Sequence, residues 1–151
     1  MIKKSLYESE VYQECLNRLE QIKPDSKPGW GKMTAAQMLS HCAEIVEVMN
    51  GKELKNIPFV AKLFKGIIRK MVLSEKPYPR NSGTHPQYEQ ESDRDFETEK
   101  KRAFDALDKF VNADIEVARQ LKHPLFEEMT PEEKGWSMYK HLDHHLRQFG
   151  V

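Results

Sequence analysis

The chain has 151 residues, of which 38% are hydrophobic and 32% charged, with 24 basic and 24 acidic side chains. This length supports one hydrophobic core, so we expect a single domain over residues 1–151. A formal net charge of zero provides no long-range field for nucleic acid or an anionic membrane, and neither is expected as a partner. No apolar run approaches the roughly 20 residues of a membrane span, and the first residues lack the apolar stretch of a secretory signal. We therefore expect a cytoplasmic, mostly helical domain.

The first two predicted helices cover residues 7–22 and 35–50. In both, apolar residues recur at spacings of three and four, which indicates one buried face. The second helix begins at a capping box, in which the side chains of Thr34 and Gln37 each bind the other residue's backbone amide. Gly51 is placed to end this helix in a left-handed turn.

The other two predicted helices cover residues 95–121 and 131–149. Helical periodicity runs through the first of them, and a second capping box, from Thr130 to Glu133, begins the other. Short connections make neighbouring helices antiparallel, whereas the long crossover over residues 51–95 allows the second and third helices to run the same way. The predicted fold is an all-α, up-down-down-up four-helix bundle with a long crossover between helices two and three.

The crossover carries a pattern of its own. Apolar residues from Phe59 to Leu73 predict a further short helix, and residues 76–87 read as a loop. Eight Lys or Arg residues lie between Lys52 and Arg80, against two Glu residues. This segment either provides a surface for a membrane or an anionic ligand, or it packs its apolar face on the bundle and leaves its charges in water.

Histidines provide the strongest chemical signal. His141 and His145 lie four residues apart, so a helix presents them on adjacent turns of one face. This is the spacing by which a helix offers two imidazoles to one metal ion. A helical wheel places both at the margin of the buried stripe and His144 further out. His41 borders the apolar stripe of the second predicted helix and is the best third ligand.

The remaining histidines and the acidic residues are weaker candidates. His85 and His123 each precede proline and belong to loops or helix ends. The acidic residues nearest to the three ligands in sequence are Glu44, Glu47 and Asp143, which we expect as solvated surface charges. Cys15 and Cys42 make no disulfide framework and read as small core residues.

A site formed by His41, His141 and His145 allows several functions. Three protein ligands leave a metal position for water or substrate, which supports hydrolysis or, with a bound thiolate, S-transfer. All-nitrogen ligation suits zinc, nickel, iron or copper. Alternatively, the ion has a structural or sensory role and the protein is not catalytic. In a third interpretation, no metal binds and the imidazoles are hydrogen-bonded core groups.

Two stretches resemble the DinB/YfiT-like metalloenzymes, and within them a branch labelled only as a domain of unknown function. They are WGKMTAAQMLSH, from Trp30 to His41, and YKHLDHHLRQF, from Tyr139 to Phe149. The segment His123-Pro124-Leu125-Phe126 is also similar to that branch, although the glycine that the branch carries near Glu127 is absent.

The resemblance implies a homodimeric four-helix bundle with one divalent metal, zinc or nickel, on His41, His141 and His145. Characterised relatives include thiol-dependent S-transferases and a mycothiol-dependent isomerase, while others have no known activity. The expected function is therefore that of a metal-dependent transferase or hydrolase of a small-molecule substrate, with a low-molecular-weight thiol as cosubstrate in the first case.

Overall fold

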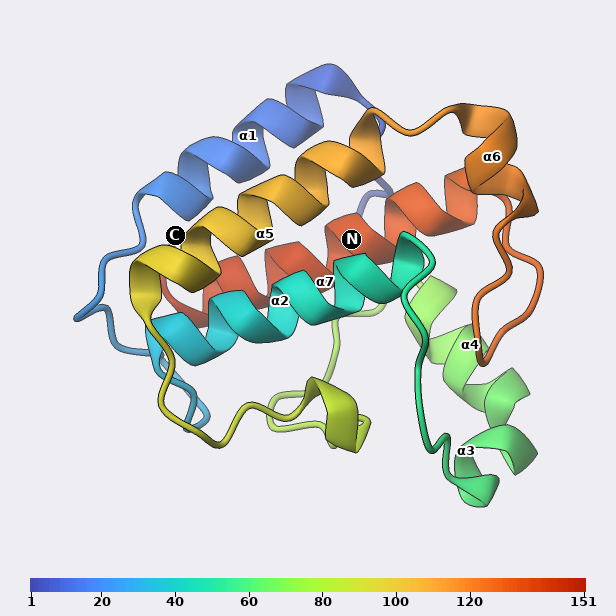
Figure 1. Cartoon of the computed structure of the whole chain (residues 1–151), viewed down its shortest axis with the longest axis horizontal. Helices are drawn as coiled ribbons and strands as arrows, with labels where there is room; N and C mark the ends of the chain where they lie inside the picture. Colours follow the sequence, from blue (N-terminus) through green and yellow to red (C-terminus); the bar gives the residue numbers. More distant parts are fainter.

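The computed structural model describes residues 1–151, and its regular structure is entirely helical. The elements are α1 (Ser9–Glu20), α2 (Ala35–Met49), α3 (Phe59–Leu63), α4 (Lys65–Leu73), the 3₁₀ turn η1 (Pro86–Tyr88), α5 (Phe96–Val111), α6 (Ile115–Gln120) and α7 (Pro131–Gln148). The four longest helices, α1, α2, α5 and α7, lie side by side, whereas α3 and α4 lie at one end of the molecule (Figure 1). The prediction of an all-helical fold is confirmed.

The two central helices begin where the sequence predicts. At α2, the Gln37 amide donates to Thr34 Oγ1 at 3.2 Å and the Thr34 amide donates to Gln37 Oε1 at 2.9 Å. The same reciprocal pair joins Thr130 and Glu133 at the start of α7, at 3.0 and 3.2 Å. Gly51 follows α2 with φ +103°, the left-handed conformation expected of it. Local capping chemistry therefore sets the starts of both helices that carry the candidate ligands.

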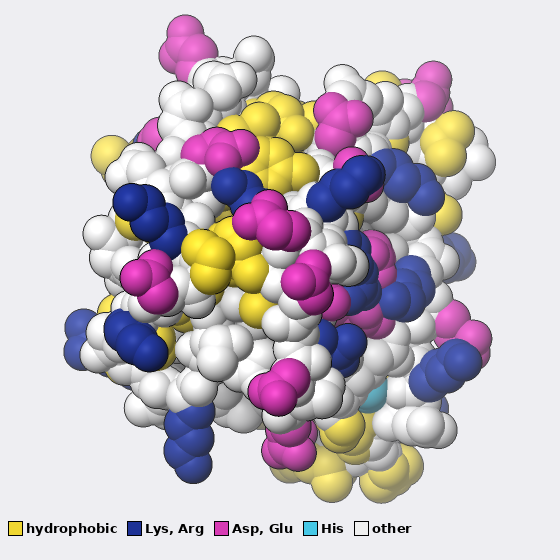
Figure 2. Space-filling view, turned by 60° about the vertical axis from the view of Figure 1, so that its left-hand side comes forward, with side chains coloured by type: hydrophobic (Ala, Val, Ile, Leu, Met, Phe, Trp, Pro, Cys, Tyr) yellow, Lys and Arg dark blue, Asp and Glu magenta, His cyan; other side chains and the backbone are white.

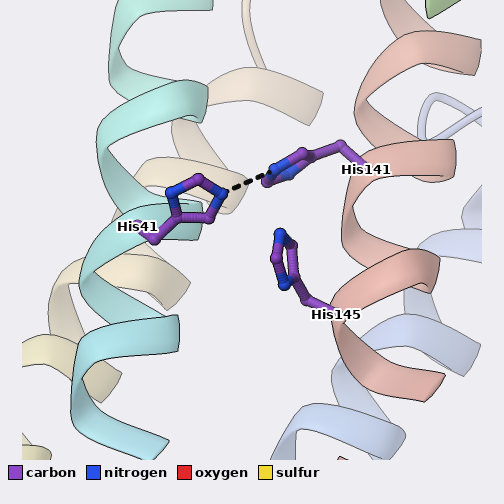
Figure 3. Close-up of side chains that lie close together, drawn as sticks. All are labelled: His41, His141 and His145. Carbon is purple, nitrogen blue, oxygen red and sulfur yellow. Dashed lines mark hydrogen bonds between the residues drawn. The ribbon is translucent and has the colours of Figure 1, made fainter. Parts of the chain in front are cut away.

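A single hydrophobic core lies between the four longest helices. Its members include Leu19 of α1, Met38 of α2, Leu107 of α5 and Leu146 of α7, all nearly or completely inaccessible to solvent. Helix α2 packs most extensively on α5 and is buried around most of its circumference. This position brings one side of α2 toward α7, and His41 lies on that side (Figure 3).

The prediction of one helix over residues 95–121 is wrong. The chain instead forms α5 and α6, because α5 ends at Val111 and Asp114 begins a new helix. The Asp114 side chain accepts hydrogen bonds from the amides of Glu116 at 2.8 Å and Val117 at 3.2 Å. Aspartate favours such caps over helix interiors, and the apolar spacing across the break gave no sign of it.

Two buried lysines of α7 hold the ends of shorter helices. Lys134 Nζ donates to the Leu121 carbonyl at 2.5 Å, just after α6. Lys140 Nζ donates to the carbonyls of Met71 and Ser74 at 2.7 and 2.9 Å, at the end of α4. Helix C-termini carry unsatisfied carbonyls and partial negative charge, so each ammonium group is a favourable cap. Burial also lowers the pKa of Lys140 to about 8.

The crossover and the surface complete the architecture. The predicted additional helix is present as two helices, α3 and α4, and the predicted loop contains η1. Glu127 has φ +60°, a left-handed conformation that glycine adopts without steric cost. Basic and acidic side chains are interspersed on the face shown in Figure 2. None of the helices combines the length and apolar character needed to cross a membrane.

Candidate metal centre

The structure brings together the three histidines that the sequence selected. His41 projects from α2, and His141 and His145 project from adjacent turns of α7 toward it (Figure 3). The Nε2 atoms of His41 and His141 are 3.0 Å apart. One ring nitrogen from each of the three residues lies within 4.8 Å of the others.

A backbone carbonyl fixes the tautomer of His41. Its Nδ1 lies 2.8 Å from the carbonyl oxygen of Tyr88, in η1. Because a carbonyl can only accept, Nδ1 carries the proton of the neutral ring and Nε2 keeps its lone pair. The Nε2 atom that faces His141 is therefore unprotonated, and its lone pair can coordinate a metal ion.

Gln148 fixes His145 in the same way. The Nε2 atom of Gln148 donates to the Trp30 carbonyl at 2.7 Å, which sets the orientation of the glutamine side-chain amide. The other atom of the amide, Gln148 Oε1, therefore faces His145 Nδ1 at 2.8 Å and accepts a hydrogen bond from it. His145 Nε2 is left with a lone pair. Such hydrogen bonds, donated by the second ring nitrogen, are a regular feature of metal-binding histidines.

The geometry and charge of the cluster fit a divalent cation. Two lone pairs repel at 3.0 Å, so the contact between His41 and His141 requires a proton or a cation between the nitrogens. Nitrogen ligands at ~2.0–2.1 Å from a tetrahedral ion lie about 3.3 Å apart, close to the 3.0 Å between the Nε2 atoms of His41 and His141. Burial, with smaller contributions from neighbouring imidazoles, lowers the pKa of all three rings, that of His145 to about 3. All three rings are therefore neutral near pH 7, as metal ligation requires.

The same three rings line a large cavity. Its volume is about 990 Å³, and its apolar wall includes Met49 of α2 and Ile68 and Val72 of α4. A volume of this size accommodates a small organic molecule. Because three protein ligands leave at least one coordination position of a metal ion open, a molecule in this cavity could reach an ion held by the histidines.

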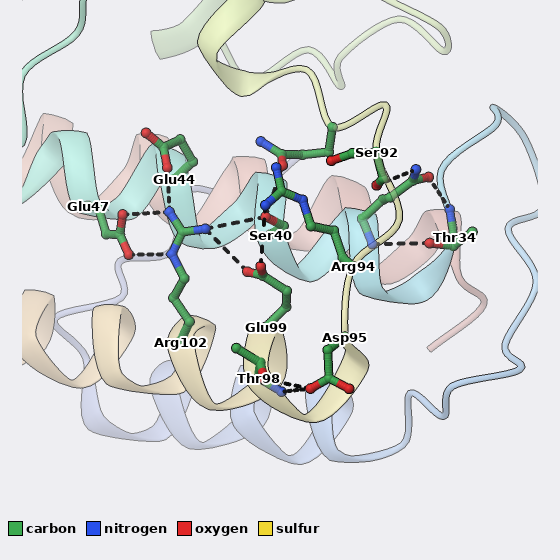
Figure 4. A network of polar contacts seen from close by, with 12 residues as sticks. Thr34, Ser40, Glu44, Glu47, Ser92, Arg94, Asp95, Thr98, Glu99 and Arg102 are labelled. Atoms are coloured by element: carbon green, nitrogen blue, oxygen red, sulfur yellow. Dashed lines mark hydrogen bonds and ion pairs between the residues drawn. The ribbon is translucent and has the colours of Figure 1, made fainter.

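An ion-pair network joins α2 and α5 through the side chains of Glu44, Glu47 and Arg102 (Figure 4). Arg102 of α5 donates to both carboxylate oxygens of Glu47 at 2.7 Å and also binds Glu44. Glu44 in turn accepts from Gln87 Nε2 at 2.9 Å. Gln87 belongs to η1, as does Tyr88, so the network ties α2 and α5 to the turn whose carbonyl orients His41.

This network corrects the expectation that the nearby acidic residues are solvated. Glu44 and Asp143 are buried, and they pair with Arg102 and Arg18 rather than with the histidines. The actual acceptors are Tyr88 and Gln148. Gln148 lies three residues after His145 on the same helix, so its spacing could have indicated the contact. The Tyr88 carbonyl contacts His41 although the two residues are far apart in the sequence, and no sequence pattern indicates such a contact.

The other three histidines contribute no ring nitrogen to the cluster, although the ring of His144 lies 5.1 Å from that of His145. His144 is partly buried between the rings of Trp30 and Tyr78, with centroids 5.7 and 5.8 Å away. His85 Nδ1 accepts the amide of Gln87, and His123 Nδ1 accepts backbone amides in a tight turn. Cys15 and Cys42 are buried and form no disulfide.

The comparisons with known proteins give one match. No curated protein and no solved structure matches the chain. A family model described as a protein of unknown function, DUF1569, matches residues 4–150. That span includes all three clustered histidines, both capping boxes and every helix. The chain therefore belongs to the DUF1569 family.

Proposed function

We propose that this chain is a metal-dependent enzyme that holds one divalent ion through His41, His141 and His145. The observation that carries the proposal is the 3.0 Å approach of two Nε2 atoms, one of them deprotonated because its ring donates from Nδ1 to Tyr88. Gln148 supports the proposal by accepting from His145 Nδ1, which leaves the lone pair of a second ring on Nε2. Zinc and nickel are the ions we expect.

The residues around the cluster suggest the division of labour. Neutral imidazoles hold the ion without cancelling its charge, and the hydrogen bonds from Nδ1 keep the rings of His41 and His145 oriented. The apolar wall of the cavity, with Met49, Ile68 and Val72, takes the nonpolar part of a small substrate and excludes water. A divalent ion bound here supplies Lewis acidity, which lowers the pKa of a bound water or thiol. This supports either hydrolysis or thiol-dependent S-transfer.

A second function is favoured by where the ligands come from. His41 belongs to α2, whereas His141 and His145 belong to α7, so an ion would join two helices that are far apart in the sequence. An ion with a purely structural or sensory role would use the same residues. In that case metal would raise the melting temperature strongly, but no small molecule would compete for its open position.

Cobalt substitution separates these functions. Co²⁺-loaded protein is titrated with a low-molecular-weight thiol while its optical absorption is recorded. The enzyme proposal predicts a new thiolate-to-cobalt band for the wild type and for His144→Ala, and none for His41→Ala. The structural role would be favoured if the protein binds cobalt, its absorption does not change on addition of thiols, and it hydrolyses no ester or amide substrate in a turnover assay.

The resemblance to the DinB/YfiT-like metalloenzymes motivates three further proposals. We infer an up-down-down-up order for α1, α2, α5 and α7, a homodimer in solution, and a cytoplasmic location. The two stretches that carry the resemblance contain His41 in one case and His141 and His145 in the other. Sedimentation equilibrium tests the dimer directly, since a monomer at all concentrations would exclude it.

A further inference from the structure

We propose that α3 and α4 form a docking surface for an anionic lipid bilayer. Their outward side exposes a group of large apolar residues: Phe59, Val60, Leu63, Phe64, Ile67 and Met71. Phe59, Leu63 and Ile67 are 77%, 65% and 68% exposed. Soluble monomers seldom expose a continuous apolar cluster of this kind unless it binds a partner or a membrane.

The exposed apolar residues are confined to one side of the segment. Ala61, Ile68 and Val72 are half-buried and line the cavity that contains the three histidines, so they face the fold rather than the outer surface. On α4, Ile67 lies about 100° around the helix from Ile68 and therefore faces away from the cavity. Figure 1 places α3 at the edge of the molecule, away from the four longest helices. The segment can therefore meet a flat surface without unfolding.

Charge selects the occupant of this surface. Eight Lys or Arg residues and only two Glu residues lie between Lys52 and Arg80, in a chain with no net charge. Lys65 and Arg69 pair with Glu127 and Glu133, whereas Lys55, Lys62 and Lys70 form no ion pair. Unpaired lysines beside exposed aromatic and aliphatic residues are typical of helices that lie in the interface of an anionic membrane.

The same charges disfavour a second copy of this chain as the occupant. A two-fold interface would place the same basic patch on both sides, so lysines would face lysines. A bilayer with anionic headgroups attracts the lysines and accepts the apolar side chains just below its surface. This inference does not depend on metal binding, because none of the surface residues is a candidate ligand.

Vesicle co-sedimentation of the full chain tests the proposal. The probes are phosphatidylcholine vesicles with and without phosphatidylserine, at low and high salt. We expect binding only to vesicles that contain phosphatidylserine, weakened by salt because the attraction is screened. Leu63→Ser and the double variant Lys62→Glu/Lys70→Glu should each bind about ten-fold more weakly or worse.

Matched controls change similar residues elsewhere on the surface. Val117→Ser on α6 and Lys101→Glu on α5 alter an exposed apolar residue and an exposed lysine, and both should bind as the wild type does. Circular dichroism confirms that each variant is folded. Failure of the wild type to bind anionic vesicles, or unchanged binding by the α3–α4 variants, would overturn the proposal. Self-association that Leu63→Ser abolishes in sedimentation equilibrium would assign the surface to a second copy and overturn it equally.

Discussion

Gln148 holds His145 in a single tautomer. Its side-chain amide accepts the proton of His145 Nδ1 at 2.8 Å, and its amide nitrogen donates to the Trp30 carbonyl at 2.7 Å. Neither atom can exchange its role, because the carbonyl of Trp30 can only accept. The result is a lone pair on His145 Nε2 that is set by a residue outside the candidate ligand set.

Replacing Gln148 should therefore weaken metal binding while leaving all three ligands in place. Gln148→Leu removes the acceptor from His145 Nδ1, and we expect a 10–100-fold loss of affinity, the range typical of such second-layer hydrogen bonds. Competition with a chromophoric chelator measures the affinity. Gln120→Leu, on the exposed surface of α6, is the matched control. Equal affinity in Gln148→Leu and the control would contradict the assigned role.

His123 should make stability depend on pH. Burial, with a smaller contribution from the charge of Lys134, lowers the pKa of His123 to about 4, against 6.5 in its ordinary range. His123 therefore becomes protonated near pH 6.5 in the unfolded chain but only near pH 4 in the folded chain. Stability from this group is complete above pH 6.5 and falls by about 1.4 kcal/mol per pH unit as pH drops through that window.

His123→Asn isolates this contribution. Asparagine can accept the amides of Leu125 and Phe126, which now donate to His123 Nδ1 at 3.1 Å, but it does not titrate. Urea unfolding in the presence of a chelator, at about pH 7 and about pH 5, should show a decline for the wild type that is about 2 kcal/mol larger than for the variant. Identical declines would mean that His123 titrates normally in the fold.

Arg102 should contribute substantially to stability. Arg102→Met removes the nearer of the two cations that pair with Glu99 and leaves Lys52 as the only cation that pairs with Glu44. Both carboxylates are buried. Because hydrogen bonds between charged groups contribute about 1.5–3 kcal/mol, we expect the free energy of unfolding to fall by about 2 kcal/mol. Arg119→Met breaks an exposed pair with Glu116 and should cost less than about 1 kcal/mol. Similar losses in the two variants would contradict the importance of the network.

Two helical glycines should respond oppositely to substitution by alanine. A Cβ atom at Gly135 of α7 would lie 2.0 Å from Ser5 Oγ and 2.9 Å from Tyr7 Cδ2, so Gly135→Ala should destabilise the fold by about 1–3 kcal/mol. At Gly66 of α4 a Cβ atom meets nothing within 4 Å, so Gly66→Ala should stabilise the fold by up to about 1 kcal/mol. Denaturant titration measures both, and a stabilising Gly135→Ala would show that the N-terminal segment does not pack on α7 as described.

Features with a local cause were predictable from the sequence. Thr34 and Thr130 identified the starts of α2 and α7, because a capping box requires only neighbouring residues. The helical spacing of His141 and His145 likewise fixed their common face. The division of the predicted third helix at Asp114 was missed, since apolar periodicity continues across it.

Features that depend on distant residues were not predictable. Glu44 and Lys140 look like surface charges in the sequence, yet both are buried. Glu44 pairs with Arg102, which is 58 residues away in the sequence. Lys140 donates hydrogen bonds to carbonyls at the end of α4. The same limitation explains why Tyr88, which orients His41 through its backbone, could not be identified from side-chain chemistry.

Metal content is the most direct test of the proposed centre. Protein purified without a histidine tag is exposed to zinc or nickel, freed of loosely bound ions, and analysed by elemental mass spectrometry. The proposal predicts one ion per chain for the wild type and for His144→Ala, and a large loss for His41→Ala and His145→Ala. Equal metal content in all four proteins, or none in the wild type, would contradict it.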